Sequence, residues 1–176
     1  MKQIIRITVS LDAKTFRRFA FFDTFAIKKH GRRPILFSLI LLAFAAVALF
    51  LKKEQSGLIA AVLLVVGLGL PILYIGVFMS QLNSQVERFK LAKGRKVYAV
   101  TLADDGVAVR NFQQKEEELH LSWDNIWRAY QRKGCVYLYA TPAKAFLLPS
   151  GQADAPDQAV LEALKEKLPP SKLFLS

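Results

Sequence analysis

Cysteine is almost absent from this chain of 176 residues. Cys135 is the only one, so no intrachain disulfide can form, and within an apolar segment it is expected to be a small buried side chain. The chain has only two histidines, and it shows no zinc-ligand spacing, no phosphate-binding glycine loop and no paired catalytic carboxylates. We therefore expect no catalytic residue, no cofactor and no metal, which predicts a protein that is not an enzyme.

Charge is absent from two long apolar runs, residues 35–51 and 58–79. As helices they would extend about 25 Å and about 33 Å, against a hydrocarbon core of about 30 Å. A soluble helical hairpin rarely needs two such runs, and a cleaved secretory signal does not fit the 34 preceding residues or the second run that follows at once. The sequence predicts two transmembrane helices joined by an external turn at 52–57.

Lysine and arginine are concentrated beside these runs. Residues 1–34 carry a net charge of +7 and residues 80–96 carry +4, whereas residues 97–176 carry −1. By the positive-inside rule, both termini are expected on the cytoplasmic side of a bacterial inner membrane. This distribution argues against a nucleic-acid partner and favours an anionic inner leaflet. The expected membrane-surface basic cluster is Lys28, Lys29, Arg32, Arg33, Lys90, Lys93, Arg95 and Lys96.

The segment 1–34 is expected to form a strand at 3–9 and a basic interfacial helix from Asp12 to about His30, with Asp12 as its cap. Four phenylalanines recur at every third position of this helix and would sweep half of its circumference. That breadth suits a helix on the lipid surface, but the rings could equally pack on the soluble domain. The four are Phe16, Phe19, Phe22 and Phe25.

After the second span, residues 80–95 are expected to form a helical juxtamembrane linker that ends at Gly94. From 96 to 176 the pattern predicts an antiparallel meander and then a helix from about Ala155 to Leu168, capped by Asp154 or a neighbour and stopped by the prolines that follow. The six strand candidates are 97–103, 107–112, 116–122, 126–131, 135–140 and 145–148. A domain of this size can bury only a small core, so the N-terminal strand is expected to join its sheet. The domain would then have about seven strands.

The fold class is therefore α+β, a transmembrane hairpin attached to a small antiparallel β domain with a C-terminal helix. Gly67, Gly69 and Pro71 should weaken or bend the second helix, which we interpret as a packing feature because no charge lies in either span. Without charged groups, the spans are expected to anchor the chain.

Polar residues alternate near the third domain strand, where they could suggest chemistry. His120, Ser122 and Asp124 would share one strand face, but neighbours there are about 6.6 Å apart, beyond the reach of a nucleophile and its base. The ladder of Glu116, Glu118 and His120 is explained by a solvated strand face. Neither set is expected to form a site.

Four segments carry a resemblance to the YcxB-like family of bacterial membrane proteins, whose C-terminal domain looks like a pleckstrin-homology-type (PH-like) fold. The similarity covers essentially the whole chain and implies no catalytic residue. The segments are Thr101–Val107, Leu121–Ile126, Tyr137–Tyr139 and Ala145–Pro149. The expected anchors of the domain are Trp123, Ile126, Trp127 and Pro149.

Three classes of function are open to such a chain. The first is a non-enzymatic membrane-anchored module whose domain binds a protein partner or a lipid headgroup, an expectation that rests partly on the PH-like analogy. The second is an accessory or structural subunit that packs through its two spans. The third, a small transporter or channel, would need an oligomer to build a pore.

Overall fold

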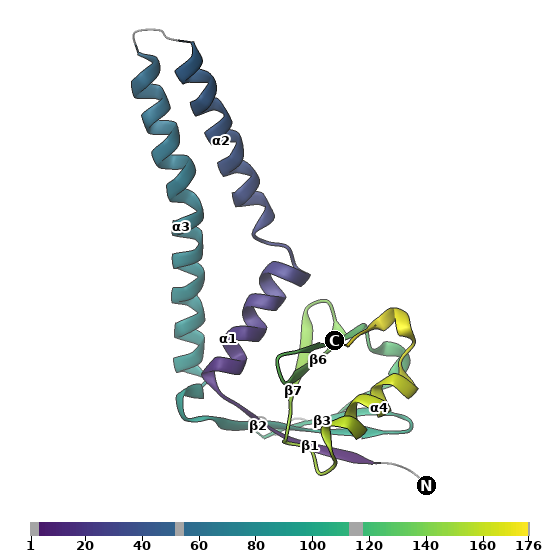
Figure 1. The fold of residues 1–176 in the computed structure, drawn as a ribbon. Helices are drawn as coiled ribbons and strands as arrows, with labels where there is room; N and C mark the ends of the chain where they lie inside the picture. The colour runs from purple at the N-terminus through teal and green to yellow at the C-terminus, as the bar shows by residue number, and fades with distance from the viewer. Residues whose placement is uncertain (1–3, 52–54, 113–117, 176) are drawn as a thin grey trace. The chain divides into compact units, whose positions relative to one another are not determined.

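The computed structural model describes residues 4–51, 55–112 and 118–175 and divides into two compact units (Figure 1). We call residues 20–88 the hairpin unit, and residues 1–19 together with 89–176 the domain unit. The predicted turn at 52–57 and the predicted strand at 116–122 fall partly outside the described residues.

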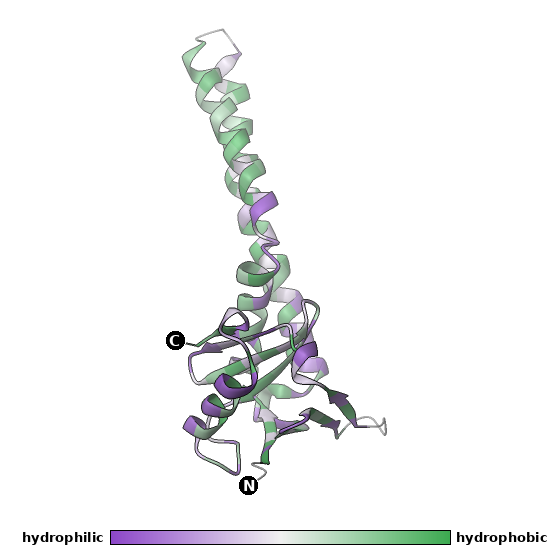
Figure 2. Ribbon diagram, turned by 90° about the vertical axis from the view of Figure 1, so that its right-hand side faces the viewer, coloured by the Kyte–Doolittle hydropathy of each residue, from purple (hydrophilic) through white to green (hydrophobic). Residues whose placement is uncertain are grey.

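The hairpin unit contains two helices long and apolar enough to cross a membrane, α2 (Arg32–Phe50) and α3 (Ser56–Arg88). Figure 2 shows both helices green along most of their length, the colour of hydrophobic residues. Most of their large apolar side chains are exposed in the structure, which is the arrangement expected of lipid-facing helices. The two predicted runs lie almost entirely within these helices.

Small side chains bring α2 and α3 together. Ala45 of α2 and Ala60 and Gly67 of α3 are buried, and a Cβ atom at Gly67 would lie 3.2 Å from the Leu42 Cδ2 atom. Small residues at such positions allow close approach of two helices within a membrane. Gly67 thus packs against α2, whereas a Cβ atom at Gly69 would meet nothing within 4 Å. Helix α3 continues through Pro71.

The N-terminal helix differs from its prediction. Helix α1 (Ala13–Phe21) is capped as expected by Asp12, whose Oδ1 atom accepts a hydrogen bond from the Thr15 N–H at 2.9 Å. The hydrogen bonds that Asp12 accepts from Thr15 lower the pKa of its carboxyl. A π-helix (Phe22–Ile27) then replaces the predicted α-helical continuation, so the phenylalanine periodicity does not persist.

The phenylalanine rings divide between the two units. In the domain unit, the Phe19 ring meets the Tyr137 ring edge to face at 5.2 Å. In the hairpin unit, the Phe21 and Phe25 rings contact the Phe78 ring of α3 at 5.0 and 5.3 Å. The open choice between lipid and domain is thereby answered for Phe19, which packs on the domain.

Two four-stranded sheets form the domain unit, in place of the single meander that the sequence suggested. Sheet A has the order β1-β2-β3-β4 and sheet B the order β7-β6-β5-β8. All neighbours pair antiparallel except β5 and β8, which are parallel. The strands of sheet A are β1 (Ile5–Leu11), β2 (Arg95–Ala103), β3 (Gly106–Asn111) and β4 (Leu119–Leu121). Those of sheet B are β5 (Arg128–Arg132), β6 (Cys135–Thr141), β7 (Lys144–Pro149) and β8 (Leu173–Phe174).

Strand β1 joins sheet A, which answers whether the N-terminal strand belongs to the domain. It pairs with β2 from Ile5 opposite Leu102 to Leu11 opposite Arg95, and its alternate residues are buried. Its outer edge is also covered, because the segment after β7 pairs with it through a bridge between Ile7 and Ala153. Hydrogen bonds therefore hold both edges of β1.

Helix α4 (Asp157–Lys167) buries Val160 and Leu164 in the same core. Asp154, the first cap candidate, is not the cap: its Oδ1 atom accepts the Arg6 N–H at 2.8 Å, and the N-cap position is taken by its neighbour Pro156 without a side-chain hydrogen bond. Three short 3-10 helices complete the unit: Leu91–Lys93, Trp123–Asn125 and Pro170–Lys172.

Candidate functional site

Four residues of the predicted basic cluster lie in the hairpin unit, between the π-helix and the first turn of α2. Lys28 forms an ion pair with Asp23 at 2.7 Å, and Lys29 has a positive φ of 53° at the turn. Arg32 and Arg33 occupy the first turn of α2, which contains no acidic residue. Cations at a helix N-terminus oppose the helix dipole, so these two arginines do not stabilise the helix itself.

The other four residues of that cluster lie in the domain unit, and all four are exposed. Lys90 adopts the left-handed conformation just after α3, and Lys93 ends a 3-10 helix. Arg95 and Lys96 open β2 opposite Leu11 and Ser10. This group therefore lies where the chain enters the domain from the second apolar helix.

The predicted domain anchors occupy different environments. Ile126 is fully buried, and the half-buried Trp123 donates its indole N–H to the Ala103 carbonyl at 2.9 Å, which ties the β2–β3 turn to the 3-10 helix. Pro149 ends β7 opposite Cys135. Trp127 is half-buried, and its ring meets the Tyr139 ring at 5.8 Å.

Arg128, which the sequence did not single out, lies between aromatic rings on sheet B. Its Cζ atom is 4.7 Å from the centroid of the Trp127 ring and 5.3 Å from that of the Phe174 ring. Its Nη1 atom donates to the Tyr130 hydroxyl at 3.2 Å. The Tyr130 and Phe174 rings stack at 4.7 Å. Aromatic side chains thus hold the guanidinium in place.

This arginine has no acidic partner among the residues that the structure describes. Ala129 of β5 pairs with Leu173 of β8, so Arg128 and Lys172 each lie one residue before this pair. The Lys172 Nζ atom donates to the Asp124 backbone carbonyl at 2.8 Å. We call Trp127, Arg128, Tyr130, Lys172 and Phe174 the arginine cluster. It offers charged N–H donors beside exposed aromatic surface.

The outer face of sheet A carries a polar groove of about 380 Å³. Arg6, Thr101, Ala108 and His120 cross this face in register. The His120 Nε2 atom is 3.8 Å from a Glu118 carboxylate oxygen, and both side chains are largely exposed. The groove therefore mixes charges of both signs over a floor of small side chains.

The polar residues near His120, for which no site was expected, lie partly within the described residues. Strand β4 ends at Leu121, so Ser122 and Asp124 do not continue its face. Glu116 of the acidic ladder lies outside the described residues. Within the described ranges, no three His, Cys, Asp or Glu side chains gather closely enough to hold a metal ion.

Cys135 and Tyr137 are both buried in β6. Burial raises the pKa of the Cys135 thiol to about 12 and, as the largest cause, that of the Tyr137 hydroxyl to about 12. Both groups are therefore neutral at physiological pH. A buried thiol of this kind is chemically inert.

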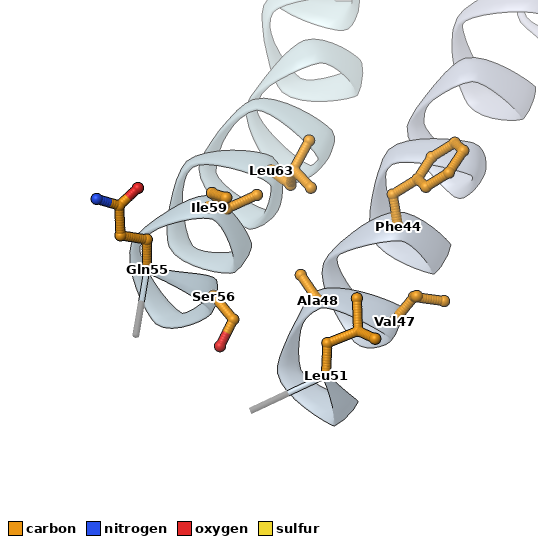
Figure 3. Close-up of a pocket in the computed structure, with 8 residues that line it drawn as sticks. All are labelled: Phe44, Val47, Ala48, Leu51, Gln55, Ser56, Ile59 and Leu63. Carbon is orange, nitrogen blue, oxygen red and sulfur yellow. The ribbon is translucent and has the colours of Figure 1, made fainter. Parts of the chain in front are cut away.

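Packing between α2 and α3 opens at the end near the connecting turn. An apolar groove of about 630 Å³ lies there, with Phe44 and Val47 on α2, Leu51 just after it, and Ile59 and Leu63 on α3 (Figure 3). Gln55 and Ser56 supply the polar side chains at its mouth. In a bilayer such a groove would be filled by lipid chains or by another helix.

Comparison of the chain with protein-family models, with curated proteins and with solved structures finds no match. Functional inference therefore rests on the geometry of the two units. Of the features above, only the arginine cluster combines charged donors without an acidic partner and a geometry fixed by aromatic packing.

Proposed function

We propose that this protein is a non-enzymatic module anchored in a bacterial inner membrane, with both termini on the cytoplasmic side. Its domain unit presents a binding surface to a protein partner or a lipid headgroup. The anionic inner leaflet attracts the basic residues that flank the spans, each contributing about 1 kcal/mol. The spans act as an anchor, because neither apolar run contains a charged residue.

The observation that carries this proposal is that, in the sequence, the hairpin unit is inserted between two paired strands of the domain unit. Strands β1 and β2 pair along seven residues, although the whole hairpin unit separates them in the chain. The domain can therefore form sheet A only when both ends of the hairpin return to it. Two chain connections, one before α2 and one after α3, restrict the domain more than a single flexible linker would.

A PH-like fold for the domain unit, and with it membership of the YcxB-like family, is part of this proposal. Two antiparallel sheets of consecutive strands, β1 to β4 and β5 to β7, followed by helix α4, support it. Folds of this type host both protein and lipid binding, so the fold alone leaves that choice open. The choice depends on the residues at the surface of the domain unit.

A matched pair of substitutions in β1 tests the proposal. Val9 is fully buried and Thr8 is exposed on the same strand. Val9→Asp should unfold the domain while leaving both spans intact, whereas Thr8→Asp should leave the domain folded. The full chain and both variants, each carrying an affinity tag, would be purified from membranes with their bound proteins and lipids. We expect a ligand retained by the wild type and Thr8→Asp but lost with Val9→Asp; equal recovery with all three would contradict a domain-based function.

Orientation has its own test. Changing Lys28, Lys29, Arg32 and Arg33 to Gln should invert or scramble the topology in a reporter-fusion assay. Because Arg32 and Arg33 oppose the helix dipole, their replacement should not weaken α2. An unchanged orientation would show that other charges determine the topology.

The alternative function, an accessory subunit of a larger membrane complex, is favoured by one observation. The apolar groove between α2 and α3 leaves room at the turn end that a neighbouring helix would fill. Replacing Ala48 in that groove with Leu should then weaken assembly without affecting the domain. An assembly that survives this change would argue against the alternative.

A further inference from the structure

The guanidinium of Arg128 has the features of a preorganised oxyanion site. Its Cζ atom lies over the Trp127 ring and over the Phe174 ring, so these two rings restrict the directions from which its N–H groups can be approached. One of these groups bonds Tyr130, and an arginine carries five N–H donors in a rigid fork. Such a fork matches the paired oxygen atoms of a phosphate or carboxylate.

The chain supplies no oxyanion of its own to this fork. Residues 97–176 contain ten acidic side chains, yet within the described ranges none pairs with Arg128. Elsewhere in the same unit, a cation of similar burial does find acidic partners, since the Lys167 Nζ atom is 3.0 Å from an Asp104 carboxylate oxygen and 3.1 Å from one of Glu166. A half-buried arginine held by rings and left without an acid is suited to an external anion.

Lys172 adds a second cation at the end of the 3-10 helix that leads into β8. Its Nζ atom makes a hydrogen bond to the Asp124 backbone carbonyl, which consumes no opposing charge. Arg128 thus supplies a fork for two oxygen atoms of a phosphate, and Lys172 supplies a point charge for the same group.

Surrounding rings and the membrane tether extend the same argument. Phe174 remains partly exposed although it stacks on Tyr130, and Trp127 is half-buried. A tethered domain encounters phosphates of the nearby leaflet at a high effective concentration. Aromatic and arginine side chains are also the residues that settle at headgroup level.

We propose that the arginine cluster binds a phosphate group, with Arg128 as the fork, Lys172 as the second cation, and Trp127 and Phe174 as the walls. The phosphate would belong either to an anionic phospholipid headgroup or to a soluble phosphate ester. This inference rests on the proposed function of the domain unit as a binding module. It assigns that function to one corner of sheet B.

The full chain in a neutral detergent, in a Trp123→Phe background, leaves Trp127 as its single tryptophan and so reports on the cluster. Inorganic phosphate and glycerol phosphate would be titrated by calorimetry and by Trp127 fluorescence. The same protein would be placed in nanodiscs of phosphatidylcholine with and without phosphatidylglycerol. Saturation by a soluble phosphate identifies an ester as the ligand; a fluorescence change confined to discs with phosphatidylglycerol identifies the lipid. Either result supports the site.

Three substitutions test the named roles. Arg128→Gln should weaken phosphate binding about tenfold or more, and Arg128→Lys should also weaken it because the charge remains while the fork is lost. Lys172→Gln should produce a smaller loss. Arg110→Gln, an equal charge change on an exposed position of sheet A, is the matched control and should have no effect. Thermal unfolding of each variant verifies that the domain remains folded.

The site would be overturned if Arg128→Gln and Arg110→Gln had the same affinity, or if no Arg128-dependent signal appeared with any phosphate. A triglutamate peptide that binds more tightly than phosphate would identify a carboxylate site and would likewise contradict the proposal. Should phosphate binding be absent while domain-dependent ligand recovery persists, the inference fails and the proposed function stands. Loss of that recovery despite phosphate binding would instead remove the proposed function.

Discussion

The Tyr98 hydroxyl bonds both backbone groups of Leu147. It accepts the Leu147 N–H at 2.7 Å and donates to the Leu147 carbonyl at 3.1 Å. Tyr98 belongs to β2 of sheet A and Leu147 to β7 of sheet B, so one side chain joins the two sheets across the core. The hydroxyl replaces a missing strand partner along that part of β7.

Tyr98→Phe should therefore destabilise the domain beyond the loss of one hydroxyl. Each buried backbone group left without a partner costs about 1 to 3 kcal/mol. We expect a lower midpoint of denaturant unfolding with an unchanged slope. Tyr74→Phe, which removes a hydroxyl from the hairpin unit, is the control and should leave domain unfolding unchanged. Equal midpoints for wild type and Tyr98→Phe would show that the paired hydrogen bonds contribute nothing.

Alkaline pH should destabilise the domain through Cys135. Its pKa is raised from 9.0 to about 12, so the native thiol stays protonated when the unfolded one has ionised. The stability from this group is complete below pH 9 and is lost as the pH rises toward 12. Denaturant unfolding at pH 8, below that window, and at pH 9.5 and 10.5, within it, should show falling stability, with a shallower decline in Cys135→Ala. A decline equally steep in Cys135→Ala would contradict this assignment.

Gly106 opens β3 where no side chain fits. A Cβ atom there would lie 2.2 Å from the Leu121 carbonyl oxygen of β4, and backbone cannot move aside as a flexible side chain can. Gly106→Ala should therefore displace β4 and destabilise the domain by about 1 to 3 kcal/mol or more. Gly76→Ala in α3, which meets nothing within 4 Å, is the control. Tolerance of Gly106→Ala with unchanged thermal unfolding would mean that β4 does not approach β3 this closely.

The turn between β5 and β6 should accept a stabilising substitution. Lys133 and Gly134 have φ values of 46° and 75°, the left-handed pair of a two-residue hairpin turn. Asparagine tolerates this conformation better than lysine, so Lys133→Asn should raise stability by about 0.5 to 1 kcal/mol. Lys144→Asn, on an exposed strand position, should not raise it. A destabilised Lys133→Asn variant would indicate that the Lys133 side chain has another role.

Local patterns were sufficient to predict several elements. A run rich in β-branched side chains predicted β1, Asp12 predicted the start of α1, and the absence of charge predicted the two long helices. Their long-range relations were less accessible. Asp154 is a residue type that often caps helices, but its carboxylate accepts a hydrogen bond from the Arg6 N–H of β1. No local sequence pattern identifies that partner.

The arginine cluster shows the same limit more strongly. Trp127, Arg128 and Tyr130 are close in sequence, but Phe174 joins them through a two-residue strand that follows two consecutive prolines. A strand of that length carries no periodicity, so the sequence predicted no strand after the C-terminal helix. The π-helix was missed because its six residues resemble the α-helix that they continue.

Replacement of both spans tests the central claim most directly. Residues 35–51 and 58–79 would be exchanged for unrelated apolar spans of equal length, with β1, α1 and the remainder of the chain retained. Domain-dependent ligand recovery from membranes would then be compared with the wild type. If the hairpin is an anchor and the domain carries the function, recovery should be unchanged. Its loss in a chimera that still inserts and folds would contradict the account and assign the function to the spans.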